Sequence, residues 1–245
     1  MKMRFIKYNI DVDSVEDILK RVIDTDAGVI VSCINANAYV TAEKDLEFNA
    51  ALSNSDVLIP DGIGIVVGFK LLKLGRINRI TGSEIHEALL REIHIRRDTV
   101  MYLGSTQTVL DKLKCKVKLN CPNINEVHTY SPPFKSSFDE ADIKLMVHKI
   151  LETKSKIVFL GLTAPKQEVL SVKLKQKCPG VSFVNVGAVF DFYSGNIKRA
   201  PKVWQKLGLE LLHRSLQNPQ KLGKRNLVSN PLFLRELLKH RFSLK

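Results

Sequence analysis

Short apolar runs alternate with longer amphipathic stretches over the first 200 residues, and this alternation restricts the fold more than any other feature. The apolar runs are rich in β-branched residues and are predicted as strands at 27–35, 55–60, 98–104, 154–161 and 181–190. Helices are predicted between them, at 41–54, 83–95 (with Ser83 as its cap), 106–119, 140–153 and 164–177. Continuous apolar strands separated by helices predict an α/β protein with a Rossmann-like parallel sheet and helices on both faces.

The chain is predicted to have two parts. The polar segment 120–138 carries three prolines and is expected to be a long loop inside the first part. After Pro201 the pattern becomes purely helical, with helices expected at 204–219 and 230–242. We therefore predict a Rossmann-like domain at residues 1–197 and a basic helical appendage at residues 198–245.

The positive charge of the chain gathers in this appendage. Of the formal net charge of +13, the appendage holds +10, from twelve lysines and arginines against two acids. The first 197 residues hold only +3. This uneven division predicts that the appendage binds a polyanion, either nucleic acid or anionic lipid.

Cysteine, histidine and hydropathy patterns exclude several classes of protein. The four cysteines form no CxxC pair and the six histidines show no metal-ligand spacing, so we expect free thiols, a reducing cytosolic environment and no metal site. The N-terminus turns acidic before any long apolar run, so no signal peptide is expected. No window approaches the roughly 18 apolar residues that a membrane span requires.

The ends of the predicted strands are where a ligand is expected, because parallel sheets bind ligands beyond the carboxyl ends of their strands. These ends carry glycines, amides, carboxylates and bases. They read NANA (35–38), DGIG (61–64), GSTQ (104–107), GLTAPKQE (161–168) and DFYSGNIKRAP (191–201).

The DGIG segment allows two interpretations. Gly62, Gly64 and Gly68 form a turn one residue longer than the dinucleotide-binding fingerprint, which favours an ordinary strand-to-helix turn over a nicotinamide site. Asp61 stands where a general base belongs, at a strand end beside glycines that leave room for a substrate. Its alternative role is the N-cap of the following helix, which local sequence alone favours.

Two further strand ends are candidates for anion binding. Lys166 lies beside the free amides of a helix start, which is typical of a phosphate pocket or of an ordinary helix beginning near proline. Lys198, Arg199 and Lys202 follow the last strand and fit a diphosphate. Asp191 lies among aromatic residues and needs a partner, for which Arg199 is the candidate.

Five motifs, taken in order, resemble the WecG/TagA/CpsF glycosyltransferases between about residues 30 and 220. They are NANAYV, VLIPDGIGIV, RITGSE, GLTAPKQE and NVGAVFDFYSGNIKRAPKVWQKLGLELLHR. The resemblance implies bacterial enzymes on the cytoplasmic face of the cell membrane. They move a sugar from a UDP-sugar to a sugar on undecaprenyl diphosphate, inverting the anomeric centre without a metal or other cofactor. The products serve teichoic acid, enterobacterial common antigen, capsule and exopolysaccharide synthesis.

The resemblance also implies roles for particular residues. Asp61 matches the proposed general base, and Asn35, Arg79 and Gln167 match residues that line the pocket. The basic appendage would dock on the membrane and close over the diphosphate, with Arg214 at a position typical of the family. Two positions depart from the pattern: Cys33 replaces a small hydroxyl residue, and Thr163 replaces a glycine.

Motifs and resemblance together give the expected site. Asp61 is the catalytic base, and the substrate-binding residues are Asn35, Asn37, Arg79, Thr81, Gly161, Lys166, Gln167, Glu168, Asp191, Lys198 and Arg199. Acceptor and membrane contacts are expected from Lys202, Arg214, Lys221, Lys224 and Arg225.

The expected function is metal-independent, inverting transfer of an N-acetylmannosamine-type sugar, its uronic acid or glucose from a UDP-sugar. The expected partners are a polyprenyl-diphosphate-linked acceptor and an anionic membrane surface, with homo-oligomers left open. Two alternatives remain: a nucleic-acid-binding protein that uses the basic appendage, which is not expected because no RNA-binding signature is present, and an NAD(P)-dependent oxidoreductase.

Overall fold

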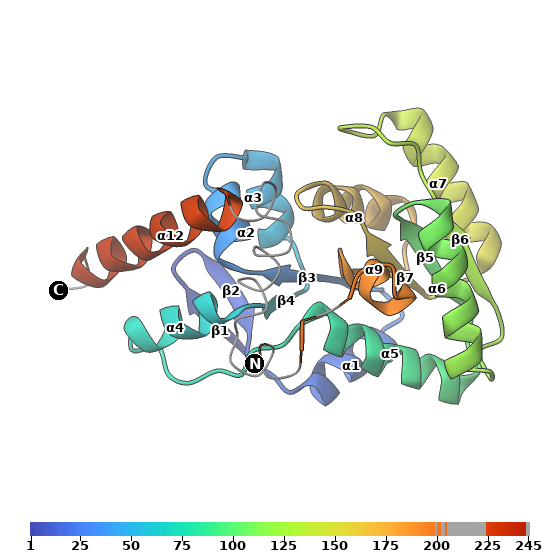
Figure 1. The fold of residues 1–245 in the computed structure, drawn as a ribbon, viewed down its shortest axis with the longest axis horizontal. Helices are drawn as coiled ribbons and strands as arrows, with labels where there is room; N and C mark the ends of the chain where they lie inside the picture. The colour runs from blue at the N-terminus through green and yellow to red at the C-terminus, as the bar shows by residue number, and fades with distance from the viewer. Residues whose placement is uncertain (199, 202–203, 205–223, 244–245) are drawn as a thin grey trace.

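The computed structural model describes residues 1–198, 200–201, 204 and 224–243, and its centre is a six-stranded parallel sheet (Figure 1). The strand order is β4-β3-β8-β7-β5-β6. The strands are β3 (Ile30–Ile34), β4 (Val57–Pro60), β5 (Val100–Gly104), β6 (Val127–Tyr130), β7 (Ile157–Gly161) and β8 (Ser182–Asn185). The predicted α/β, Rossmann-like sheet is therefore confirmed.

Helices cover both faces of the sheet. Alternate residues of a strand point to opposite sides, and here both sides are apolar and need to be covered. In β5, Val100 and Tyr102 face one core, while Met101 and Leu103 face another. The first face packs against α1 (Val15–Ile23), α5 (Gly82–Arg96), α6 (Gln107–Asn120) and α9 (Val189–Ser194). The second packs against α2 (Ala36–Ala42), α3 (Leu46–Ser53), α4 (Ile63–Leu71), α7 (Glu140–Thr153) and α8 (Lys166–Lys177).

Several predicted boundaries are wrong, each for a local reason. The apolar run 181–190 is a strand only to Asn185, because Gly187 adopts a φ of 57° and the chain then turns into α9. The predicted helix 41–54 is two helices, since Asp45 caps a separate α3. Thr81, not Ser83, caps α5. The segment 120–138 contains the edge strand β6.

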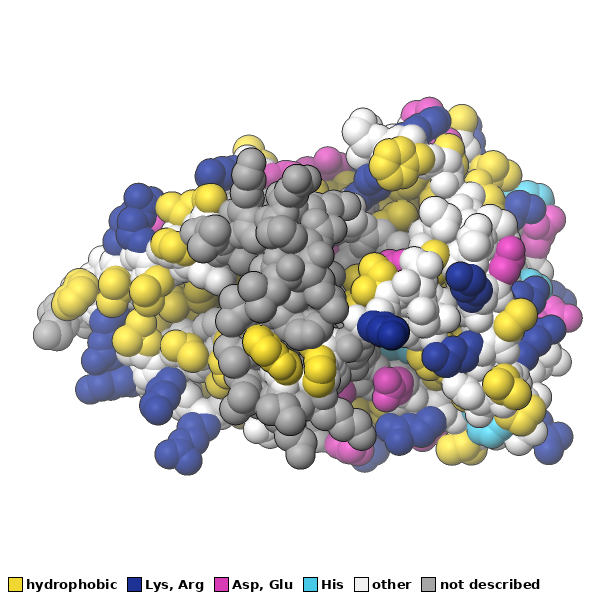
Figure 2. Space-filling view, in the orientation of Figure 1, with side chains coloured by type: hydrophobic (Ala, Val, Ile, Leu, Met, Phe, Trp, Pro, Cys, Tyr) yellow, Lys and Arg dark blue, Asp and Glu magenta, His cyan; other side chains and the backbone are white. Residues whose placement is uncertain are grey.

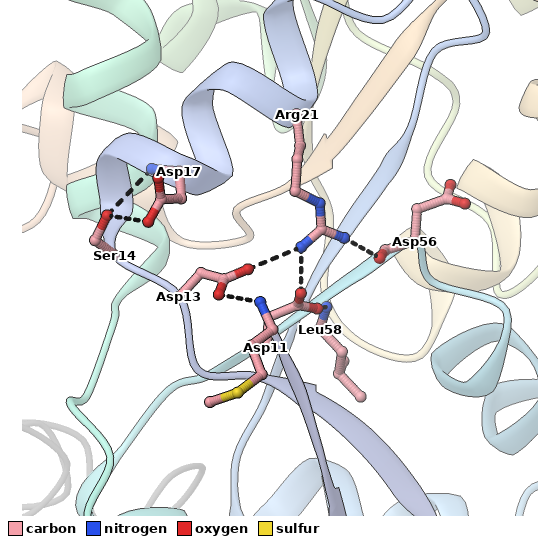
Figure 3. A network of polar contacts seen from close by, with 8 residues as sticks. Asp11, Asp13, Ser14, Asp17, Arg21, Asp56 and Leu58 are labelled. Atoms are coloured by element: carbon pink, nitrogen blue, oxygen red, sulfur yellow. Dashed lines mark hydrogen bonds and ion pairs between the residues drawn. The ribbon is translucent and has the colours of Figure 1, made fainter.

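An antiparallel hairpin, β1 (Lys2–Phe5) and β2 (Tyr8–Asp11), precedes the sheet and is tied to it by one buried carboxylate (Figure 3). Asp11 is fully buried and accepts a hydrogen bond of 2.8 Å from the backbone N of Leu58. It also pairs with Arg21 of α1, whose guanidinium donates to the carbonyl of Asp56 at 2.8 Å. Asp11 thereby joins the hairpin, α1 and β4.

The C-terminal helix α12 (Lys224–Ser243) packs on α2 and α4 (Figure 1). Phe233 and Leu237 are buried in the same core as the hairpin, α2 and α4. The Ser229 hydroxyl donates to Oδ1 of Asn37 at 2.9 Å. No helix in the described ranges is long and apolar enough to cross a bilayer. The domain boundary near residue 198 stays a prediction.

His86 of α5 makes folding sensitive to acid. Its Nε2 lies 3.0 Å from the Tyr102 hydroxyl, its Nδ1 has no partner, and burial lowers its pKa to about 3. An unfolded chain protonates this ring below about pH 6.5 while the native protein does not, so stability falls as the pH drops from 6.5 toward 3. Between pH 7 and 5 the loss due to His86 is about 2 kcal/mol.

Urea unfolding of wild-type and His86→Phe protein at both pH values measures this effect. The wild type should lose about 2 kcal/mol more than the variant between pH 7 and 5. His148→Phe, at an exposed histidine of α7, is the matched control and should follow the wild type. Equal pH dependence in wild type and His86→Phe would contradict the prediction.

Candidate functional site

The loops that follow the adjacent strands β3 and β8 leave the sheet toward opposite faces. After β3 the chain enters α2 on the second face, and after β8 it enters α9 on the first. Where neighbouring strands diverge in this way, an open α/β sheet binds its ligands at the carboxyl edge. The candidate site is therefore built around the ends of β3 and β8, with β4 beside them.

Asp61 lies at this place, directly after β4. Its backbone N donates to the carbonyl of Ile34 at 2.9 Å, which joins the ends of β4 and β3. Gly62, with a φ of 93°, is the N-cap of α4 and makes no side-chain cap bond. The N-cap interpretation of Asp61 is therefore wrong, because Gly62 holds that position; the Asp61 side chain is partly exposed.

Asn35 lies beside Asp61. Its side chain caps α2 by accepting a hydrogen bond from the backbone N of Ala38 at 2.9 Å. A Cβ on Gly62 would approach the Cβ of Asn35 to 3.5 Å, and one on Gly64 would approach that of Ala36 to 3.4 Å. Both distances are ordinary contacts, so space does not require glycine at either position; the φ of 93° favours glycine at residue 62.

Cys33, near the end of β3, is at the centre of the cluster. Its Sγ lies 3.7 Å from the carbonyl oxygen of Asn185, and a Cβ on Gly82 would come within 3.5 Å of it. Desolvation raises the pKa of the thiol well above its usual value, and the nearby carboxyls of Asp61 and Glu168 raise it further. The thiol therefore stays protonated and does not serve as a nucleophile.

Gln167 and Glu168, in the first turn of α8, are buried between the ends of β7 and β8. Gln167 Nε2 donates to Glu168 Oε1 at 2.8 Å, and Gln167 Oε1 accepts from the backbone N of Gly187 at 3.0 Å. Burial raises the pKa of Glu168 to about 7, although the hydrogen bond from Gln167 acts in the opposite direction. Both amide functions of Gln167 are thereby held in place.

Arg79 and Thr81 are brought to the end of β4 by the chain between them. The backbone N of Ile80 donates to the carbonyl of Pro60 at 3.1 Å. Thr81 forms a capping box with Glu84, and its hydroxyl is occupied by that carboxylate at 2.7 Å. The structure therefore brings Asp61 and Glu168 close to Cys33, with Asn35 and Gln167 beside them, and it brings the backbone of Arg79 and Thr81 to the end of β4.

Lys166 is turned away from this cluster. Its ammonium donates to the carbonyl of Lys135 and lies 5.6 Å from the ring centroids of Phe134 and Phe138, in the segment that follows β6. The edge strands β4 and β6 are five strand spacings apart, roughly 24 Å. Its ammonium is thus directed toward the opposite edge of the sheet from Asp61, although its role in substrate binding stays a prediction.

Gly161, Asp191 and Asn37 have clear packing partners. A Cβ on Gly161 would come within 2.2 Å of the Phe190 ring, so this glycine lets α9 pack on β7. Asp191 Oδ1 accepts a hydrogen bond from Asn196 Nδ2 at 2.9 Å. Asn37, as described above, is bonded to α12. Substrate contacts of all three stay predictions.

The remaining predicted residues lie in the basic C-terminal part of the chain. Lys198 is exposed, and Lys224 and Arg225 lie in the first turn of α12. The proposed pairing of Asp191 with Arg199 and the contacts of Lys202, Arg214 and Lys221 fall outside the described residues.

Sequence reasoning missed a buried polar network beneath the cluster. Asn185 Nδ2 donates to Ser32 Oγ at 3.0 Å and to Ser171 Oγ at 3.1 Å, and Ser171 Oγ donates to the carbonyl of Glu168 at 2.8 Å. The network joins β3 and β8 to the first turn of α8. One signal in the sequence could have indicated this network: Asn185 ends the otherwise apolar strand SFVN. A buried side-chain amide needs hydrogen-bond partners, so a polar network around it was to be expected.

The assembled groups suit chemistry on a polar substrate. The strand ends carry the partly exposed carboxyl of Asp61, the side-chain amides of Asn35 and Gln167, the thiol of Cys33 and the buried acid Glu168. Within the described ranges, no three His, Cys, Asp or Glu side chains form a group that would hold a metal ion. The expected independence from metals stays a prediction.

Known proteins identify the family. A model of the glycosyl transferase WecG/TagA/CpsF family matches residues 3–245. An N-acetylglucosaminyldiphosphoundecaprenol N-acetyl-beta-D-mannosaminyltransferase of Bacillus spizizenii is 30% identical over 218 residues, which cover 89% of this chain and 82% of the relative. The chain therefore belongs to the WecG/TagA/CpsF family of glycosyltransferases.

Proposed function

We propose that the protein transfers an N-acetylmannosamine-type sugar from a UDP-sugar to a sugar carried on undecaprenyl diphosphate, with inversion at the anomeric carbon. The observation that carries the proposal is the position of Asp61, directly after β4 at the carboxyl edge of the sheet and one residue before the N-cap Gly62, in a chain of this family. The named relative transfers N-acetyl-beta-D-mannosamine to a diphosphoundecaprenol-linked sugar, which supports the choice of acceptor and sugar. Family membership favours this function over an oxidoreductase or a nucleic-acid binder.

The proposed reaction is a single displacement. The acceptor hydroxyl oxygen attacks the anomeric carbon of the donor while its proton passes to the Asp61 carboxylate. The bond from that carbon to the diphosphate oxygen breaks, and its electron pair leaves with UDP. One displacement at the anomeric carbon inverts its configuration.

The leaving diphosphate needs positive charge or hydrogen-bond donors in the transition state. Arg79 is a candidate, because the hydrogen bond from Ile80 to Pro60 brings its backbone to the end of β4, which Asp61 follows. Lys198 is exposed beyond α9 and available for the same role. We propose that these cations act in place of a metal.

The direct test is a transfer assay with a short-chain lipid diphosphate acceptor and three donors, UDP-N-acetylmannosamine, UDP-glucose and UDP-N-acetylglucosamine. We expect transfer from the first, in chelator as well as in magnesium, with a product of opposite anomeric configuration by NMR. Retained configuration would contradict the single displacement, and loss of activity in chelator would contradict metal independence.

We further propose that the protein lies on the inner face of the cell membrane through its C-terminal part and α4. Apolar side chains of α12 remain exposed, notably Leu234 at 49% and Leu238 at 39%, and Ile63 and Val67 are exposed on the neighbouring α4. Lysines and arginines surround them, as Figure 2 shows at the end of the molecule where α12 and α4 lie. Exposed apolar residues among basic residues are typical of peripheral binding to anionic bilayers.

Vesicle flotation tests this surface. Replacing Leu234 and Leu238 with Asn should lower the binding constant for phosphatidylglycerol vesicles by about thirtyfold, because each leucine loses roughly 1 kcal/mol of apolar burial. The matched control replaces Leu145 and Leu151 of α7, exposed at 45% and 54%, and should float like the wild type. Equal recovery of all three proteins would refute this docking surface.

A further inference from the structure

Glu168 is a buried carboxyl whose hydrogen bonding is incomplete. It is only 2% exposed, and its Oε1 accepts a hydrogen bond from Gln167, while its own backbone N–H also acts on the carboxyl. Its Oε2 is buried and has no hydrogen-bond partner. An ionised carboxylate offers about four acceptor positions, so an Oε2 without a partner leaves the charge poorly compensated, whereas a protonated carboxyl requires much less.

Among the described residues, no lysine or arginine forms an ion pair with Glu168, and no basic group is a cause of its raised pKa. The thiol of Cys33 on β3 lies between two acids, since the carboxyls of both Glu168 and Asp61 act on it. The next residue inward, Asn185 of β8, presents an Oδ1 that also has no partner. Strands β7 and β8 carry no charged residue.

Charged residues on the helices packed against α8 are engaged elsewhere. Glu47 of α3 pairs with Lys173, and Glu140 of α7 pairs with Lys177, both further along α8. Lys166 lies in the same first turn as Glu168, but its ammonium donates a hydrogen bond to the backbone carbonyl of Lys135. The environment therefore favours the neutral acid, and burial brings the pKa of Glu168 to about 7.

We propose that Glu168 is the positioning residue that makes donor binding depend on pH: as a neutral acid it permits the donor diphosphate to bind beside Asp61, and its ionisation opposes that binding. The inference rests on the proposed UDP-sugar donor. Ionised Glu168 would place a second negative charge at the strand ends that receive the diphosphate. Ionisation would also make the buried position of Glu168 beside Gln167 less favourable. Gln167 in turn accepts the hydrogen bond from the backbone N of Gly187.

We expect the affinity for the donor to fall as the pH rises through neutrality. The diphosphate diester of a UDP-sugar does not titrate in this range, so a change in affinity reports on the protein. A negative charge close to the diphosphate in a partly buried site repels it strongly enough to change binding by about tenfold. The donor KM of the wild type should therefore rise about tenfold from pH 6 to pH 8.5, with a smaller change in kcat.

Glu168→Gln tests the inference because glutamine resembles the neutral acid and cannot ionise. For each protein the ratio of the donor KM at pH 8.5 to that at pH 6 is measured with UDP-N-acetylmannosamine, alongside its calorimetric Kd. Glu168→Gln should give a ratio near one, and the matched control Glu87→Gln, at an exposed position of α5, should give the wild-type ratio. A wild-type ratio in Glu168→Gln would overturn the inference.

Urea unfolding shows whether Glu168 titrates, independently of any donor. Because its pKa is higher in the folded protein than in the unfolded chain, its stabilising contribution is present at pH 4.5 and is lost as the pH rises through 7. Glu168→Gln should therefore gain stability relative to the wild type over that range, and no relative gain would overturn the inference. A third outcome is that Glu168→Gln shows this gain in stability but neither the wild type nor the variants bind the UDP-sugar at any pH. That outcome would contradict both the proposed UDP-sugar donor and the inference.

Discussion

Replacing Asp61 with Asn is expected to lower turnover by about 10²–10⁴-fold, the usual contribution of a positioned general base. Asparagine has nearly the same shape but cannot accept a proton from the attacking hydroxyl. The substitution leaves the backbone hydrogen bond from residue 61 to Ile34 intact, and Gly62 continues to cap α4. The variant should therefore keep its fold and its affinity for donor while losing turnover.

A matched variant separates catalysis from helix capping. Asp45→Asn changes the N-cap of α3, where the side chain accepts from the backbone N of Phe48 at 2.9 Å. Since Asn is also a good N-cap, turnover should stay within about twofold of the wild type. Transfer rates and thermal unfolding of the two variants form the comparison. Near-normal turnover in Asp61→Asn would refute the assignment of Asp61 as the base.

Replacing Asp11 with Ala is expected to lower the free energy of unfolding by about 3 kcal/mol. The change removes a fully buried acceptor, which leaves the backbone N of Leu58 without its hydrogen bond and Arg21 without its nearest carboxylate (Figure 3). Arg21 is 35% exposed and keeps its bond to the Asp56 carbonyl, so the loss should lie at the lower end for a buried pair.

Two variants give the scale for this measurement. Asp11→Asn keeps one acceptor oxygen and should lose less than Asp11→Ala. Asp17→Ala removes an exposed carboxylate in the first turn of α1 and should cost no more than about 1 kcal/mol. Urea unfolding with two optical probes measures all three. A loss below 1 kcal/mol for Asp11→Ala would mean that the hairpin is held mainly by its apolar contacts.

The elements with strong hydrophobic periodicity were predictable, and the short polar ones were not. Helix α7 was predicted at its observed bounds, because Asp139 begins an amphipathic stretch of fourteen residues. Strands β1 and β6, four residues each, carry few apolar side chains and form because neighbouring strands supply hydrogen-bond partners. That supply depends on residues far away in the chain, so no local pattern predicts it.

The candidate site was only partly predictable for the same reason. Placing Asn35, Asp61 and Gln167 at strand ends required only the order of strands and helices along the chain. The direction of Lys166 did not follow, because the segment after β6 provides its partners. The buried network of Asn185 was also unforeseen, since its hydrogen bonds join residues 153 and 14 positions apart.

The sequence by itself determined the parallel α/β sheet, the residues at its strand ends and the concentration of positive charge after residue 197. Only the tertiary structure excluded Asp61 as the N-cap of α4, and only it showed that Glu168 is buried without an ion pair to any described lysine or arginine. Periodicity and composition are properties of neighbouring residues. Burial, hydrogen-bond supply and the pKa of an acid depend instead on which distant segments fold against it.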